Sequence, residues 1–206
     1  MIESRRGSAS TSMIDAAQFF HQRGWLLGTC GNLSVQISQD PRQVLVTPSG
    51  KDKGRLVPSD FLLVNDQGQP LGGGGKASEE LSVHLEIYRR TSAQAVYHVH
   101  SVPNNLASHL WREQGFVEFQ GMEMIKGIAG KTLHDVIALP IVANHQDMQE
   151  LAHSVGSALR QDIPAVLVHQ HGIYAWGTSP EAARRHVEIF EFLCDYKVQL
   201  HGRPGQ

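Results

Sequence analysis

Several features that mark particular classes of protein are scarce in this sequence of 206 residues. Only two cysteines occur, Cys30 and Cys194, which excludes a disulfide framework and favours a reducing cytoplasm. No apolar run approaches the roughly 20 residues of a membrane-spanning helix, so no membrane partner is expected. The formal net charge of −2 gives no excess of basic residues, so we expect no nucleic-acid partner either.

The length and the composition predict one globular domain. Hydrophobic residues make up 41% of the chain and charged residues 18%, as in ordinary globular proteins, and a chain of this length can bury a sizeable core. Residues 1–12 are polar and lack the apolar core of a secretory signal. We therefore expect a flexible N-terminal segment over 1–12 and a single domain over 13–206.

Helices and strands are expected to interleave along the chain. Several strands are joined by short turns rather than by helices, which favours an α/β fold with a mixed or largely antiparallel sheet and helices on its faces. The run Gly72–Gly75 is interpreted as a flexible linker, the alternative being a mobile segment of the active site. Expected helices span about 12–23, 78–90, 104–112, 147–161 and 180–200, and expected strands about 33–37, 43–47, 61–64, 95–99, 116–119, 140–142, 165–169 and 173–176.

Two histidines on one predicted strand are the first candidates for chemistry. His98 and His100 occur in Ala95-Val96-Tyr97-His98-Val99-His100, and side chains two residues apart in a strand leave the same face, about 6.6–6.8 Å apart along the chain. One metal ion can accept that spacing. Zinc in catalytic sites usually takes about three protein ligands, and His171 is the best candidate for the third. The alternative is that these histidines are ordinary packed or surface residues.

Three loops contain the residue types that hold a phosphate. They offer hydroxyl, amide and backbone N–H groups on small residues, and Ser78 is placed where a helix should begin, a position that favours an anion. Serine and glycine also fill ordinary turns, which is the alternative for each loop. The loops are Gly31-Asn32, Thr47-Pro48-Ser49-Gly50 and Lys76-Ala77-Ser78.

Two glutamates accompany the histidines. Glu80 lies on the helix before the histidine strand, with His84 one turn later. Glu123 lies in an apolar segment, Gly121 to Gly127, and burial there would raise its pKa and suit it to proton transfer near neutral pH. The alternative is a solvent-exposed ion pair between Glu123 and Lys126 at i,i+3, and the residues alone favour neither.

Taken together, these motifs resemble the class II aldolase family over about residues 13–200. The resemblance implies a single three-layer α/β domain with a central, mainly antiparallel sheet flanked by helices. It also implies one Zn²⁺ per subunit bound by three histidines, a phosphorylated ketose as the substrate, and a homotetramer with sites near subunit interfaces. The motifs, in chain order, are Gly31-Asn32, Thr47-Pro48-Ser49-Gly50, Lys76-x-Ser78-x-Glu80-x-x-x-His84, Ala95 to Ser101 and His171-Gly172.

The same resemblance implies roles for individual residues. Glu123 would be the catalytic acid or base, whereas Glu80 falls where aldolases of the family carry their catalytic glutamate, so its role here is open. Lys126 could help to hold the substrate phosphate or another oxygen. The zinc ligands would be His98, His100 and His171, and the residues in phosphate-binding loops would be Asn32, Ser49, Gly50 and Ser78.

Three functions are compared. The segment 120–128 and the residues after His171 resemble members of the family that remove water from a phosphorylated ketose in methionine salvage. An aldolase or a 4-epimerase on the same scaffold is the alternative within enzymes. The third is a non-catalytic interaction module that keeps the fold and has lost the site, and the intact histidines and Glu123 argue against it.

Overall fold

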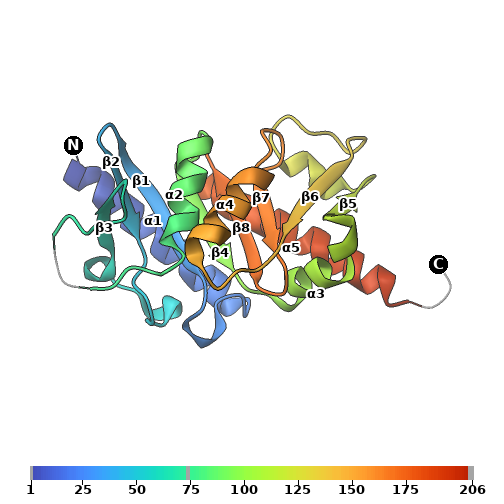
Figure 1. The fold of residues 1–206 in the computed structure, drawn as a ribbon, viewed down its shortest axis with the longest axis horizontal. Helices are drawn as coiled ribbons and strands as arrows, with labels where there is room; N and C mark the ends of the chain where they lie inside the picture. Colours follow the sequence, from blue (N-terminus) through green and yellow to red (C-terminus); the bar gives the residue numbers. More distant parts are fainter. Residues whose placement is uncertain (1, 73–74, 204–206) are drawn as a thin grey trace.

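The centre of the molecule is a sheet of eight strands in the order β3-β2-β1-β4-β8-β7-β6-β5, seen in a computed structural model that describes residues 2–72 and 75–203 (Figure 1). Every neighbouring pair is antiparallel except β6 and β7, which are parallel. The predicted mainly antiparallel sheet is thus confirmed. The strands are β1 (Asn32–Gln39), β2 (Arg42–Val46), β3 (Leu62–Asn65), β4 (Ala95–Val99), β5 (Phe116–Phe119), β6 (Ile137–Val142), β7 (Ala165–Val168) and β8 (Gly172–Gly177).

Helices cover both faces of this sheet and produce the expected three layers (Figure 1). In β4, Tyr97 and Val99 point into one core and Val96 into the other, because successive side chains of a strand leave opposite faces. His98 therefore faces the same side as Val96. The first core packs against α1 (Ile2–Gln22), α3 (Val102–Leu110) and α5 (Pro180–His201), and the second against α2 (Leu81–Arg90) and α4 (Met148–Ala158).

The first helix begins earlier than predicted. α1 starts at Ile2 rather than near Ser12, so the flexible segment expected over residues 1–12 differs from the structure, in which 2–12 are helical. Ala9 and Ser10 are buried, and Arg5 donates a hydrogen bond to the Ile37 carbonyl at 3.4 Å. These contacts with the sheet stabilise a polar helical turn that its own sequence does not favour.

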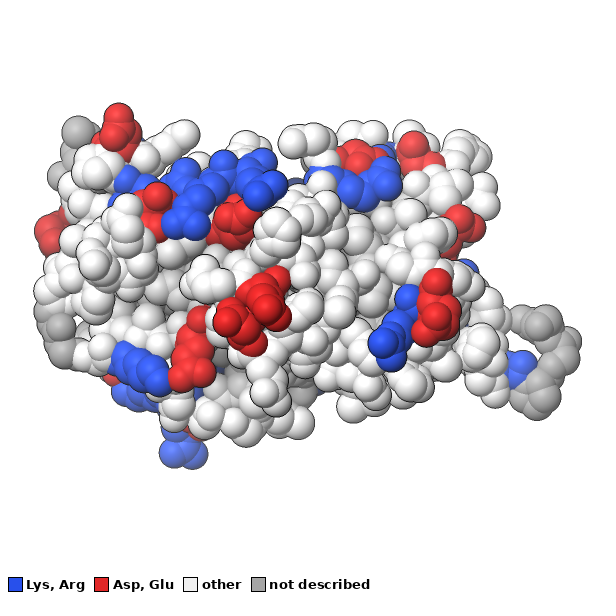
Figure 2. Space-filling view, in the orientation of Figure 1, with Lys and Arg blue, Asp and Glu red and all other residues white. Residues whose placement is uncertain are grey.

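The glycine linker and the lack of a membrane-spanning helix are two further expectations from the sequence. Residues 73 and 74 of the predicted glycine linker lie outside the described residues. Among the residues that are described, no helix has the length and apolarity needed to cross a membrane. Figure 2 shows basic and acidic side chains lying beside one another on the face in view, with neutral surface between them.

Candidate metal centre and phosphate loops

The candidate histidines meet because of the pairing between β4 and β8. His98 is directly paired with Tyr174, and His171 lies in the turn that immediately precedes β8. This turn packs closely on the end of β4. A Cβ atom at Gly172 would lie 2.5 Å from the Val99 carbonyl oxygen and 2.8 Å from the His100 ring, so only glycine fits there.

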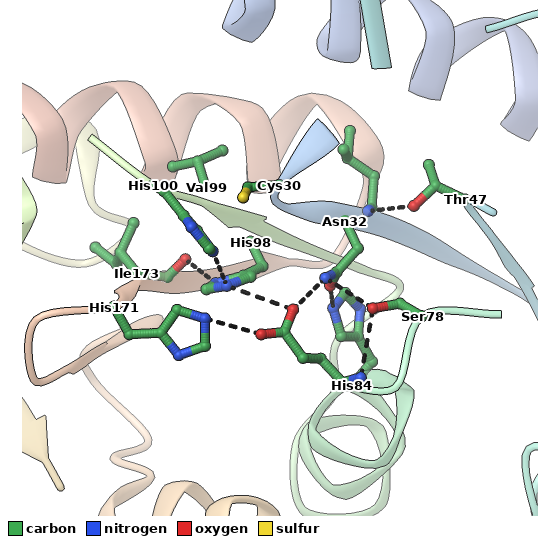
Figure 3. Close-up of polar contacts among 12 residues, drawn as sticks. Cys30, Asn32, Thr47, Ser78, His84, His98, Val99, His100, His171 and Ile173 are labelled. Atoms are coloured by element: carbon green, nitrogen blue, oxygen red, sulfur yellow. Dashed lines mark hydrogen bonds and ion pairs between the residues drawn. The ribbon is translucent and has the colours of Figure 1, made fainter. Parts of the chain in front are cut away.

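Three imidazoles and one carboxylate converge where the end of β4 meets the turn before β8, at the ends of the two central strands of the sheet (Figure 3). One ligand atom from each of Glu80, His98, His100 and His171 lies within 4.8 Å of the others. The Nε2 atoms of His98 and His100 are 2.7 Å apart. Glu80, at the start of α2, places one carboxylate oxygen 2.8 Å from His171 Nε2 and the other 3.6 Å from His98 Nε2.

The orientation of His98 is fixed from two sides. Its Nδ1–H donates a hydrogen bond to the Ile173 carbonyl at 3.0 Å, which leaves the lone pair on Nε2 directed into the cluster. The ring also stacks on Tyr174, with 3.9 Å between ring centroids and 11° between ring planes. His98 is fully buried, so neither ring nitrogen is free to turn toward bulk water.

The charges of the cluster are set by its burial. Burial lowers the pKa of His98 well below its ordinary value, and burial together with His171 lowers the pKa of His100 to about 4. Burial alone would raise the pKa of Glu80, but His98 and the hydrogen bonds from His171 and Asn32 together lower it. At neutral pH His98 and His100 of the metal-free cluster are therefore neutral, and Glu80 is a carboxylate anion.

This donor set fits a divalent metal ion. Three imidazoles and one carboxylate are ligand types that zinc and other first-row transition metals accept, and His98 has the backbone hydrogen bond typical of metal-bound histidine. His171 Nδ1 is buried and has no hydrogen-bond partner among the described residues, while Nε2 of the same ring lies 2.8 Å from Glu80. The four residues together could hold one ion.

The predicted phosphate loops lie beside this cluster. Asn32 Nδ2 donates to Ser78 Oγ at 3.1 Å and also to Glu80, so the residue that begins β1 contacts both a loop serine and the cluster (Figure 3). The N–H of Ser49 donates to the Lys76 carbonyl at 2.9 Å, which joins the second loop to the third. The structure thus brings the three loops together at one edge.

A buried chain of hydrogen bonds stands behind Asn32. His84 Nε2–H donates to Asn32 Oδ1, and its Nδ1 accepts from Ser34 Oγ at 2.7 Å. Ser34 Oγ in turn lies 2.8 Å from the Tyr88 hydroxyl. Burial lowers the pKa of His84 to about 4, so its ring is neutral and can donate from one nitrogen and accept at the other.

Glu123 and Lys126 do not join the cluster within this chain. Of the two arrangements that the sequence left open for Glu123, burial does not occur, because its side chain is 74% exposed and its carboxylate lies 2.6 Å from Lys126 Nζ. The alternative, an exposed i,i+3 pair, is what the structure shows. In this 3₁₀ turn, Glu123–Gly127, Ile125 is the residue that enters the core, so the glutamate on the opposite side points outward.

Sequence reasoning gave no role to three buried polar residues near the site. Lys53 and Glu191 are 2% exposed, and His84 is fully buried. Only His84 left a signal, since it follows Glu80 by four residues and so lies on the same helical face. The residue type alone does not show whether a lysine or a glutamate is buried. Here the burial depends on contacts with elements that are distant in the sequence.

The fold and the cluster define an α/β protein with a candidate metal site at the ends of the central strands of a mixed sheet. The model of the family "Class II Aldolase and Adducin N-terminal domain" matches residues 11–198, and the chain belongs to that family.

Relatives of similar length extend the comparison. A methylthioribulose-1-phosphate dehydratase of an Exiguobacterium species is 42% identical over 179 residues, which cover 86% of this chain and 87% of the relative. A methylthioribulose-1-phosphate dehydratase of Persephonella marina is 38% identical over 197 residues, with 95% and 92% covered. Among solved structures, L-fuculose-1-phosphate aldolase from Thermus thermophilus is 28% identical, with a TM-score of 0.72 and coverages of 95% and 96%. YgbL from Escherichia coli, described as a putative aldolase/epimerase/decarboxylase, is 27% identical, with a TM-score of 0.79 and coverages of 98% and 93%.

Proposed function

We propose that this protein dehydrates 5-methylthioribulose 1-phosphate to 2,3-diketo-5-methylthiopentyl 1-phosphate in methionine salvage, as a cytoplasmic zinc enzyme. The observation that carries the proposal is the convergence of His98, His100, His171 and Glu80 beside the phosphate loops. Relatives that carry this activity in their names match the chain over most of its length. The free thiols of Cys30 and Cys194 fit a reducing compartment.

The reaction removes one molecule of water from the substrate. The C3 proton leaves to a base, the C4–O bond breaks as an acid protonates that hydroxyl, and the resulting enol becomes the second ketone. Zn²⁺ held by His98, His100 and His171 would supply Lewis-acid polarisation of the C2 carbonyl. The residues of the chain must therefore provide a proton acceptor, a proton donor and a site for the phosphate.

Glu80 and Glu123 are the two candidate proton carriers. Glu80 is ionised and half-buried, and its carboxylate lies within the cluster, so it can accept a proton from a substrate bound there. We assign to Glu123 the protonation of the leaving hydroxyl.

The phosphate would bind where the three loops meet. Ser78 Oγ accepts a hydrogen bond from Asn32, which leaves the hydroxyl hydrogen of Ser78 available for a phosphate oxygen. Gly50 has a positive φ of 67°, and an added Cβ there would meet open space, so its backbone is accessible at the loop surface. We propose that Asn32, Ser49, Gly50 and Ser78 form this subsite. Lys126 would contact a substrate oxygen from the same segment as Glu123.

Glu123 would reach the metal centre of a neighbouring subunit in a homotetramer. Its side chain is exposed and lies in a cleft lined by Met122, Phe192 and Tyr196. Phe192 and Tyr196 are 48% and 49% exposed, and together with Leu200 they form an apolar row at i, i+4 and i+8 along α5. Such a row favours contact with another protein surface, and a second copy would bury it while carrying Glu123 toward the neighbouring site.

Purified enzyme and 5-methylthioribulose 1-phosphate test the activity directly. We expect the diketone and water as the only products, with no aldehyde. Cleavage to two carbon fragments would instead show an aldolase, and no turnover by metal-loaded protein would exclude both. The Glu123→Gln variant should retain metal and lose about 10²–10⁴ in rate, a typical acid–base contribution.

Co-expression tests whether Glu123 acts between subunits. The Glu123→Gln and His171→Ala proteins carry different tags, and hybrids are isolated by purification on both tags. Each parent should be inactive, whereas hybrids should recover roughly a quarter of wild-type activity, because random pairing unites an intact cluster with an intact Glu123 at that frequency. Hybrids as inactive as their parents would show that Glu123 acts only within its own chain.

A further inference from the structure

Lys53 is a lysine whose ammonium group is buried behind two of the phosphate loops. It lies in the short 3₁₀ turn Lys53–Arg55 and is 2% exposed. Its Nζ donates to the Thr29 carbonyl at 2.8 Å and to the Lys51 carbonyl at 3.0 Å. Four other lysines of the chain pair with a carboxylate at the surface, namely Lys51, Lys76, Lys126 and Lys131.

The charge of Lys53 is not compensated by an ion pair. Among the described residues no carboxylate oxygen lies within 4.0 Å of its Nζ, because the neighbouring Asp52 accepts from the Gly54 N–H at 2.9 Å and lies 3.6 Å from Arg55. Burial lowers the pKa of Lys53, and only the more distant Cys30, Asp52 and Glu80 oppose that shift. A buried ammonium with neutral partners is unfavourable for folding, which points to a ligand that needs it.

The two carbonyl partners place Lys53 between specific loops. Thr29 precedes Asn32 by three residues, and Lys51 directly follows Gly50. Thr29 is one of two non-glycine residues with positive φ in the described chain, at 65°, and its carbonyl is held by the ammonium in that uncommon conformation. One cation thus joins the two loops through backbone carbonyls.

We propose that Lys53 is a positioning residue of the phosphate subsite, which holds the Gly28–Asn32 and Thr47–Gly50 loops in register and supplies the positive charge that offsets the substrate phosphate. This inference rests on the proposed phosphate-ester substrate. It requires no direct contact between Nζ and substrate, since a charge in a region of low dielectric acts over a longer distance than one in water.

The test compares Lys53→Met with Arg55→Met in the metal-loaded protein. Both variants remove one positive charge from the same turn, but Arg55 has a side chain that is 86% exposed. The dissociation constant of inorganic phosphate is measured by calorimetry for both. We expect Lys53→Met to weaken phosphate binding about tenfold or more, as for a lost hydrogen-bonded charge, and Arg55→Met to change it less than about threefold.

The stability of the ligand-free variants separates this role from a structural one. If Lys53 serves the ligand, Lys53→Met should keep its metal and unfold at a similar denaturant concentration, because removal of an unpaired buried charge offsets the loss of the hydrogen bonds to the Thr29 and Lys51 carbonyls. If Lys53→Met does not fold, its phosphate affinity and stability are replaced by those of Lys53→Gln, which keeps a hydrogen-bond donor but has no charge. Unchanged phosphate affinity in either folded variant overturns the proposal. If the Lys53 variants lose phosphate affinity but the wild type does not turn over 5-methylthioribulose 1-phosphate, the role proposed for Lys53 stands and the dehydratase function is rejected.

Discussion

Asn32 in β1 and His98 in β4 are directly paired residues of neighbouring antiparallel strands. The pairing connects the two halves of the candidate site, because Asn32 contacts Ser78 of the phosphate loops and His98 belongs to the metal cluster. The close approach of the two segments also depends on Gly31, where a Cβ atom would lie 2.7 Å from the His98 carbonyl oxygen. Metal and phosphate are therefore expected to bind at a fixed separation.

The orientation of the Asn32 amide is predicted to depend on His84. The ring of His84 donates to Asn32 Oδ1, which directs Nδ2 toward Glu80 and Ser78. His84→Phe keeps a planar ring but removes both nitrogens, so the amide loses the partner that sets its direction. We expect kcat/KM to fall about 10- to 100-fold while the metal content is retained, since one to two hydrogen bonds near the reacting groups are lost.

Tyr88→Phe is the matched control, because it removes the far hydroxyl of the same chain and leaves the bond between Ser34 and His84 in place. It should reduce kcat/KM less than about threefold. Equal losses in the two variants, or loss of metal from His84→Phe, would contradict a role in orienting Asn32. The measurements are steady-state kinetics and metal content of dialysed protein.

His171 is predicted to decide whether the metal is retained. In His171→Ala the third imidazole is lost, and we expect affinity for Zn²⁺ or Co²⁺ to fall by at least about 100-fold, because even the outer partners of metal ligands contribute about 10- to 100-fold. Turnover should be abolished. Competition with a chelator measures the affinity, and the absorption spectrum of bound Co²⁺ reports the ligand geometry.

His169→Ala provides the control for that variant. His169 lies two residues earlier in the same turn, but its ring stacks on His109 with 5.9 Å between centroids and is not part of the cluster. It should keep its metal and the Co²⁺ spectrum of the wild type. Full activity of metal-free wild-type protein would refute the metal-dependent mechanism altogether.

The parts of the site that follow from local rules could be predicted from the sequence. The spacing of His98 and His100 fixes their common direction, because a strand has a period of two residues. The mainly antiparallel sheet followed from short turns between strands, as between β1 and β2. His171 was the candidate for the third ligand before the family motifs were considered, but no local pattern in the sequence places its turn beside the end of β4.

Properties that depend on tertiary packing could not be predicted in this way. The sequence left burial and exposure of Glu123 open, because it does not state which side of a 3₁₀ turn faces inward, and the residue that enters the core is Ile125. The first turns of α1 are helical through contacts of Ala9 and Arg5 with the rest of the molecule. Lys53 is buried by loops that come from other parts of the chain.

Glu191 connects the last helix to the segment that follows β4, the strand that carries His98. Its carboxyl group lies in α5 and accepts hydrogen bonds from Ser101 Oγ and, at 2.7 Å, from Asn104 Nδ2. Burial raises the pKa of Glu191, and the nearby Asp195 raises it further. These effects exceed the lowering by the two hydrogen bonds, so that the pKa is about 7. The folded protein therefore keeps a proton on this group at a pH where the unfolded chain has lost it.

The sign of the resulting pH dependence follows from proton binding. Between the unfolded pKa of about 4.5 and the folded pKa of about 7, the folded state binds more protons, so the free energy of unfolding falls as pH rises and then levels off. The total change is on the order of 3 kcal/mol. Glu191→Gln is neutral at every pH, and it should match the wild type near pH 5 and exceed it in stability near pH 8.

Urea denaturation of metal-free protein at pH 5, 6, 7 and 8, at one protein concentration, measures this difference. Subtraction of the variant from the wild type cancels the titration of all groups that the two proteins share. Glu188→Gln is the control on the same helix, since Glu188 is 40% exposed and pairs with Arg184 at 3.0 Å. The comparison shows whether the pH dependence requires a buried carboxyl group rather than any glutamate of α5. If the free energies of unfolding of Glu191→Gln and the wild type change with pH in parallel, the Glu191 carboxylate is ionised in the folded protein. That result would rule out a neutral Glu191 between α5 and α3.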